Sequence, residues 1–63
     1  MSEELDQFGI QRELLTVEQK LLQIRDSFMG YAAGDETEEV KVLDATVKKV
    51  RSLQAKMRRW FAP

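Results

Sequence analysis

Several residue types that build active sites, metal sites or covalent cross-links are missing from this chain of 63 residues. It has no cysteine and no histidine, so disulfides and a zinc site built from these ligands are excluded. The same absences remove the commonest general base and the strongest side-chain nucleophile. We therefore expect no enzyme activity, no cofactor and no bound metal.

Long apolar runs and a strong overall charge are missing as well. No apolar stretch approaches the roughly 20 residues that a membrane-spanning helix needs. The first residues, MSEELDQ, are acidic and polar, which is not typical of a secretory signal peptide. Ten basic and eleven acidic residues leave a net charge of −1, so the chain has no strong field of one sign. We expect a cytoplasmic protein.

The length allows one small domain, which we take to be residues 1–63. A chain this short buries little apolar surface by itself and is usually stabilised by disulfides, a metal or a partner chain. Because the first two are excluded by composition, self-association is the remaining means of stabilisation.

The apolar residues that are present follow a period close to 3.5, which is typical of helices packed as in coiled coils. One run predicts a helix over about residues 3–31, and a second predicts a helix over about residues 36–61. The first seam is Ile10, Leu14, Val17, Leu21, Ile24, Phe28 and Tyr31, and the second is Val40, Leu43, Val47, Val50, Gln54, Met57 and Phe61.

Helix-end signals agree with two helices joined by a short connection. Ser2 is the expected N-cap of the first helix, and Asp35 is the expected N-cap of the second. Gly30 or Gly34 can supply the left-handed residue that ends the first helix. Pro63 cannot extend the second helix. The predicted fold class is therefore all-α, an antiparallel helical hairpin.

A turn centred near Gly34 fixes which residues of the two helices lie at the same height. Leu21 then meets Val47, and Leu14 faces Gln54. Gln54 is the one polar residue in the second seam, and two interpretations stay open for it. It is either a buried amide that fixes register and oligomeric state, or a side chain that bends out to solvent. In an apolar layer, Gln54→Leu would be expected to raise stability.

The same register places Phe8 and Gly9 beside Trp60. Glycine inside a helix costs about 1 kcal/mol relative to alanine. Either Gly9 makes room for the indole, or the first turn is frayed and tolerates the glycine.

Each helix carries more apolar surface than one seam uses. The surplus predicts a homodimer, with a second hairpin completing a four-helix bundle. The residues expected in that oligomer interface are Phe8, Leu15, Leu22, Met29, Leu53 and Trp60.

The second helix is basic toward its end, and two interpretations compete. Cations are favoured at a helix C-terminus by the helix dipole. A basic helix ending in Trp-Phe also suits a protein or membrane contact, or a nucleic-acid backbone with stacking on an unpaired base. The candidate partner-binding residues are Lys48, Lys49, Arg51, Lys56, Arg58, Arg59 and Trp60.

Taken together, the residues favour a small non-catalytic regulator or adaptor that acts through protein contacts of a helical hairpin. The expected partners are a second copy of the chain and another protein. The alternative is a nucleic-acid-binding regulator that uses the basic face between Lys48 and Trp60. A membrane surface ranks below both.

Overall fold

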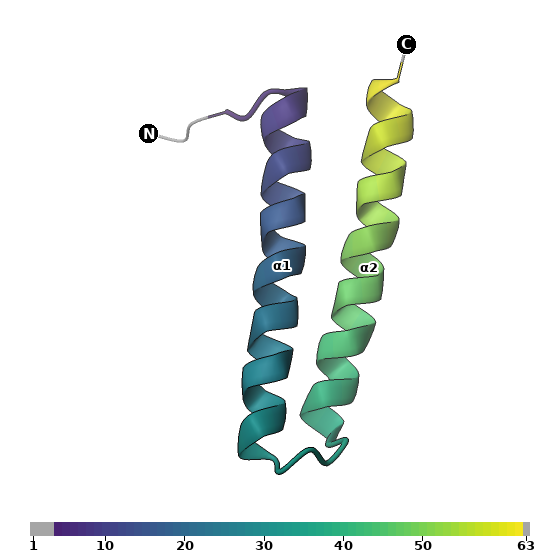
Figure 1. The fold of residues 1–63 in the computed structure, drawn as a ribbon. Helices are drawn as coiled ribbons and strands as arrows, with labels where there is room; N and C mark the ends of the chain where they lie inside the picture. Colours follow the sequence, from purple (N-terminus) through teal and green to yellow (C-terminus); the bar gives the residue numbers. More distant parts are fainter. Residues whose placement is uncertain (1–3, 63) are drawn as a thin grey trace.

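The chain folds as a hairpin of two long helices. The computed structural model describes residues 4–62. Helix α1 spans Gln7–Tyr31 and helix α2 spans Glu38–Phe61, and the turn between them brings α2 back alongside α1 (Figure 1). The two helices pack against each other, so the predicted all-helical hairpin is confirmed.

Helix α1 begins later than predicted, because a cap further along the chain is used. Residues 4–6 are not helical, and Asp6 is the N-cap, with its carboxylate accepting the Gly9 amide at 2.6 Å. The Ser2 cap predicted from the sequence lies outside the described residues. A Cβ atom on Gly9 would lie 3.1 Å from Asp6 Oδ1 and 3.4 Å from Leu5. Gly9 therefore makes room for its own helix cap, and neither interpretation of it from the sequence is needed.

The turn that ends helix α1 has an alanine, Ala33, at a position where glycine is usual. The Gly34 amide donates to the Met29 carbonyl at 2.9 Å, and the Ala32 amide donates to Phe28. The bond from Ala32 is the last regular bond of the helix, and the bond from Gly34 is the 6→1 hydrogen bond of a Schellman motif. Its left-handed position is held by Ala33 at φ 57°, and Gly34 follows at φ 81°. Glycine is the usual residue where Ala33 lies, because it has no Cβ to clash.

Helix α2 begins two residues later than predicted. Thr37 is the N-cap, and its hydroxyl accepts the Val40 amide at 3.3 Å. The prediction of Asp35 as the cap is wrong, because the chain needs residues 32–37 to turn back onto α1. Glu38 and Glu39 lie in the first turn, where the helix dipole favours acids.

The contact between the helices is apolar on α2 and mixed on α1. All seven predicted seam positions of α2 are buried or part-buried, so that half of the prediction is confirmed. On α1, four predicted seam residues are part-buried, as predicted: Ile10, Leu14, Leu21 and Phe28. They are joined by three part-buried polar residues that share their side of the helix: Gln11, Glu18 and Arg25.

The other half of the predicted α1 seam is wrong. Val17, Ile24 and Tyr31 are exposed, because α1 is rotated so that polar side chains reach across to α2. The predicted register is nevertheless confirmed, since the Gln54 amide nitrogen lies 3.2 Å from the Leu14 carbonyl.

The hairpin is a single layer of helices. It measures 45 × 27 × 14 Å, and 14 Å is little more than the diameter of one helix with its side chains. Among the described residues, only Val40 and Val47 are buried apolar side chains, at 2% and 3% exposure. Stable domains usually have two packed layers around a core, and this chain supplies one.

Candidate functional site

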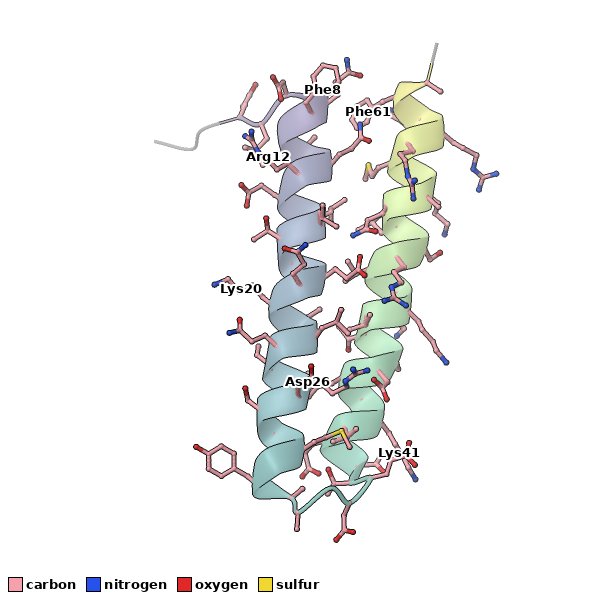
Figure 2. All side chains as sticks on the ribbon, viewed as in Figure 1. Phe8, Arg12, Lys20, Asp26, Lys41 and Phe61 are labelled. Atoms are coloured by element: carbon pink, nitrogen blue, oxygen red, sulfur yellow. The ribbon has the colours of Figure 1, made fainter. Side chains whose placement is uncertain are left out.

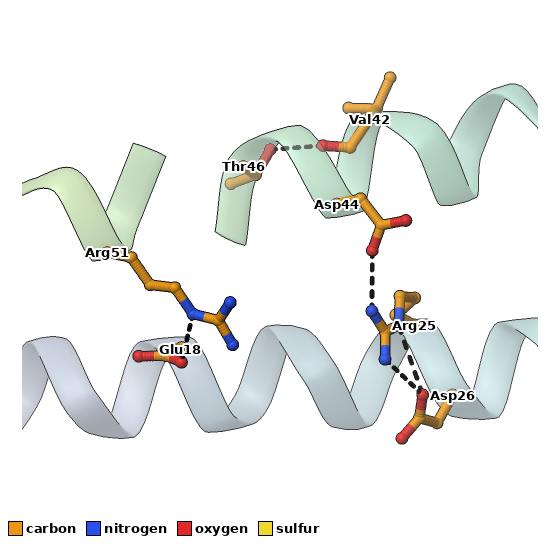
Figure 3. Close-up of polar contacts among 7 residues, drawn as sticks. All are labelled: Glu18, Arg25, Asp26, Val42, Asp44, Thr46 and Arg51. Carbon is orange, nitrogen blue, oxygen red and sulfur yellow. Dashed lines mark hydrogen bonds and ion pairs between the residues drawn. The ribbon is translucent and has the colours of Figure 1, made fainter. Parts of the chain in front are cut away.

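A polar cluster crosses the helix contact near its middle. Arg51 Nε donates to Glu18 Oε2 at 2.9 Å, and Gln54 Nε2 donates to Glu18 Oε1 at 3.0 Å (Figure 3 shows the Arg51 contact). These hydrogen bonds, with that from Arg51 the larger cause, lower the pKa of Glu18 below its ordinary value of 4.5. The Gln54 side chain is therefore part-buried with its amide nitrogen donating to Leu14 and Glu18, and it does not bend out to solvent.

A second polar contact closes the half of the hairpin nearer the turn. Arg25 donates to Asp44 across the helices at 2.8 Å and to its neighbour Asp26 at 3.2 Å (Figure 3). The hydrogen bond to Asp44, followed by that to Asp26, raises the pKa of Arg25. Both polar contacts fix the register of the hairpin, and neither leaves a buried polar side chain unpaired in residues 4–62.

The side chains of the basic region spread around α2. Arg51 is held by Glu18, and Arg58 lines a hollow with Gln11, Leu15 and Gln54. Lys48 lines another hollow beside Leu22. The helical period turns Lys49 and Lys56 away from α1. The seven predicted partner-binding residues are thus all exposed, but they cover about half of the helix circumference.

The predicted oligomer-interface residues lie on two different sides of the hairpin. Leu15 and Leu22 line the hollows that they share with Arg58 and Lys48. Because residues advance by about 100° around a helix, Leu53 and Trp60 lie on the opposite flank of α2 from Lys48. Trp60 is 81% exposed. Phe8 and Phe61 both lie at the open end of the hairpin (Figure 2), and Met29 is part-buried.

The side opposite Lys48, Arg51 and Arg58 carries six of the nine exposed large apolar side chains of the described residues. Val17 and Ile24 follow Leu15 and Leu22 by two residues, so they lie on the other flank of α1. Ile24, Phe28 and Tyr31 line one shallow hollow there, together with the polar side chains of Lys20, Gln23 and Ser27. We call this side the apolar face and define it by its exposed members Val17, Ile24, Tyr31, Val42, Leu53 and Trp60. The opposite side, with Leu15, Leu22, Lys48, Arg51 and Arg58, is called the mixed face.

Four of the apolar-face residues were not among the predicted interface residues: Val17, Ile24, Tyr31 and Val42. The first three were assigned to the seam within the hairpin. A signal for their true place exists in the sequence, because α1 has three apolar lines spaced by seven residues. The line of Leu14, Leu21 and Phe28 lies between the other two. A helix that turns this middle line toward its partner has the other two lines on either side of the contact, so the middle line is the one expected to face α2.

Two further observations concern membrane spans and metal ligands. No helix within residues 4–62 is long and apolar enough to cross a membrane. The same residues contain no group of three or more side chains that could hold a metal ion. Compared with known proteins, the chain matches no family model, no curated protein and no solved structure.

Proposed function

We propose that this protein is a small non-catalytic regulator or adaptor that acts through protein contacts and self-associates into a four-helix bundle. The observation that carries the proposal is the single helical layer with an apolar face on its outside. Exposed apolar surface of this extent, spread over both helices, is typical of interaction sites.

The surface area supports the proposal quantitatively. The hairpin exposes 5353 Å², whereas a compact monomer of 7.3 kDa exposes roughly 4,200 Å². The excess of roughly 1,200 Å² is larger than the approximately 800 Å² that each partner buries in a standard interface.

Sedimentation equilibrium at micromolar concentration tests self-association. We expect a mass of about 14.6 kDa, which is twice the 7.3 kDa of the chain. A species of 7.3 kDa with full far-UV helicity would contradict the proposal, because the apolar face would then be stable in water.

A nucleic-acid-binding regulator is the second candidate, and one observation favours it. Within residues 4–62, Arg25 and Arg51 are the only cations that form ion pairs. The described carboxylates therefore do not pair with the other cations of the basic region, which are available to bind phosphates: Lys48, Lys49, Lys56, Arg58 and Arg59. The spread of these cations around α2 and the net charge of −1 weigh against it.

Salt-dependent binding separates the two candidates. If the basic region binds nucleic acid, affinity falls steeply with salt, with a slope set by the number of phosphates neutralised. Replacing Lys49, Lys56 and Arg59 by Glu should then abolish binding, while the control Lys20→Glu on α1 should change it little. Absence of binding by the wild type at low salt would remove this candidate.

A further inference from the structure

We propose that the apolar face is the site for a second copy of the same chain, which packs on it face to face and antiparallel about a twofold axis. The proposal rests on the self-association proposed above and adds the surface, the direction and the register of the contact. The surfaces of the two copies are identical, so the contact is isologous and closes as a dimer.

Apolar side chains of the face match one another under a single twofold axis. An axis midway between Val17 and Ile24 on α1 lies between Lys20 and Leu21. An axis midway between Val42 and Leu53 on α2 lies between Val47 and Lys48. The Gln54 to Leu14 contact shows that residue numbers summing to about 68 share a height in the hairpin.

The two midpoints therefore lie at the same height in the hairpin. The residues on either side of them, 20 on α1 with 48 on α2 and 21 on α1 with 47 on α2, have numbers that sum to 68. One axis therefore brings Val17 of each copy opposite Ile24 of the other, and Val42 opposite Leu53. Ile10 and Tyr31 are brought together by the same axis. Five of the six apolar-face residues thus meet an apolar residue of the other copy, and Trp60 meets the turn of the other copy at Asp35.

Charge along the hairpin supports the same direction. The turn end is acidic, with Asp35, Glu36, Glu38 and Glu39, whereas the far end of α2 is basic, with Lys56, Arg58 and Arg59. A parallel dimer would bring the two acidic turns together, which is unfavourable within a Debye length of about 10 Å. The antiparallel dimer brings each acidic turn near the basic end of the partner.

Matched charge substitutions on the two faces test the surface. Ile24 is 53% exposed on the apolar face, and Leu15 is 50% exposed on the mixed face of the same helix. We expect Ile24→Glu to weaken dimerisation at least tenfold, and Leu15→Glu to change it less than threefold. The opposite ranking would overturn the assignment of the surface.

Cysteine pairs test the direction, and the absence of native cysteine makes this experiment clean. The probe is a short bis-maleimide added to mixtures of two single-cysteine variants. An antiparallel dimer cross-links Val42→Cys to Leu53→Cys, which meet across the axis. A parallel dimer instead places α1 against α2 of the partner and cross-links Val17→Cys to Leu53→Cys.

Cross-linking of the first mixture and not of the second is the expected result. The reverse result would overturn the proposed direction, and a dimer that gives neither product would overturn the proposed register. A wild-type chain that sediments as a folded monomer would remove the proposed self-association as well. A dimer broken by Leu15→Glu would instead leave the proposed function standing and remove this inference alone.

Discussion

The two halves of the hairpin are held together in different ways. In the half nearer the turn, Val40 and Val47 are almost fully buried, and Arg25 joins Asp44 across the helices. In the open half, the seam of α2 passes through Gln54, which hydrogen-bonds to α1. The difference shows that the deeply buried core of the described residues lies near the turn, whereas polar contacts across the helices are present in both halves.

The largest expected effect is loss of packing in the turn half. Val40→Ala removes two carbon atoms from a side chain with 2% exposure, which should cost about 2 kcal/mol of unfolding free energy. Val50→Ala makes the same change at a part-buried position in the open half and should cost about half as much. Urea denaturation of both variants checks this. Equal costs would show that the open half is packed as tightly as the turn half.

The stability of the open half should depend on the hydrogen bonds of Gln54. Gln54→Leu removes donors to the Leu14 carbonyl and to Glu18, so we expect a loss of about 1 kcal/mol. The expected effect on stability is thus opposite to the gain predicted for a Gln54 side chain in an apolar layer. Gln11→Leu is the control, because the Gln11 amide bonds only to Gln7 of its own helix. A more stable Gln54→Leu variant, measured by thermal melting, would show that these bonds do not offset the desolvation of the amide.

The turn offers a stabilising substitution. Ala33 has a left-handed backbone, which costs an L-residue roughly 1–2 kcal/mol. Because glycine lowers that cost but is more flexible when unfolded, Ala33→Gly should stabilise the hairpin by about 0.5 kcal/mol. Ala32→Gly, at φ −86°, should destabilise it instead. If both substitutions destabilise the hairpin in urea, the Schellman geometry assigned to this turn is wrong.

The smallest effect concerns pH. Glu18 has a lowered pKa in the folded chain, so its charged form is favoured by folding. Its contribution to stability is therefore present above the ordinary value of 4.5 and is lost as pH falls through the lowered folded pKa. Thermal melts between pH 7 and pH 3 should show a steeper loss for the wild type than for Glu18→Gln. Parallel curves would mean that Glu18 is not linked to folding.

Much of the fold could be predicted from the sequence because the signals are local and periodic. The heptad spacing from Val40 to Phe61 identified the inward side of α2, and the glycine at position 34 located the turn. The register followed from the turn, as the contact between Leu14 and Gln54 shows. The helix starts were predicted less well, because Asp6 and Thr37 compete with other good caps nearby.

The candidate site was harder to predict because it depends on how far α1 rotates about its axis. Three apolar lines on α1 fit a helical period equally well. The line that faces α2 is determined by Glu18 and Arg25, because their partners Arg51 and Asp44 lie on that helix. The spacing by itself makes the line of Leu14, Leu21 and Phe28 the middle one. The cross-helix pairs that set the rotation of α1, and so leave Val17 and Ile24 exposed, are visible only in three dimensions.

Our central claim is that a single hairpin leaves its core incomplete and that a second copy completes it. Thermal melting over an approximately 100-fold range of protein concentration tests this claim, because dimerisation couples stability to concentration by mass action. We predict that Tm rises steadily with concentration and that Ile24→Glu removes most of the rise. A Tm that stays constant over the whole range would contradict the claim.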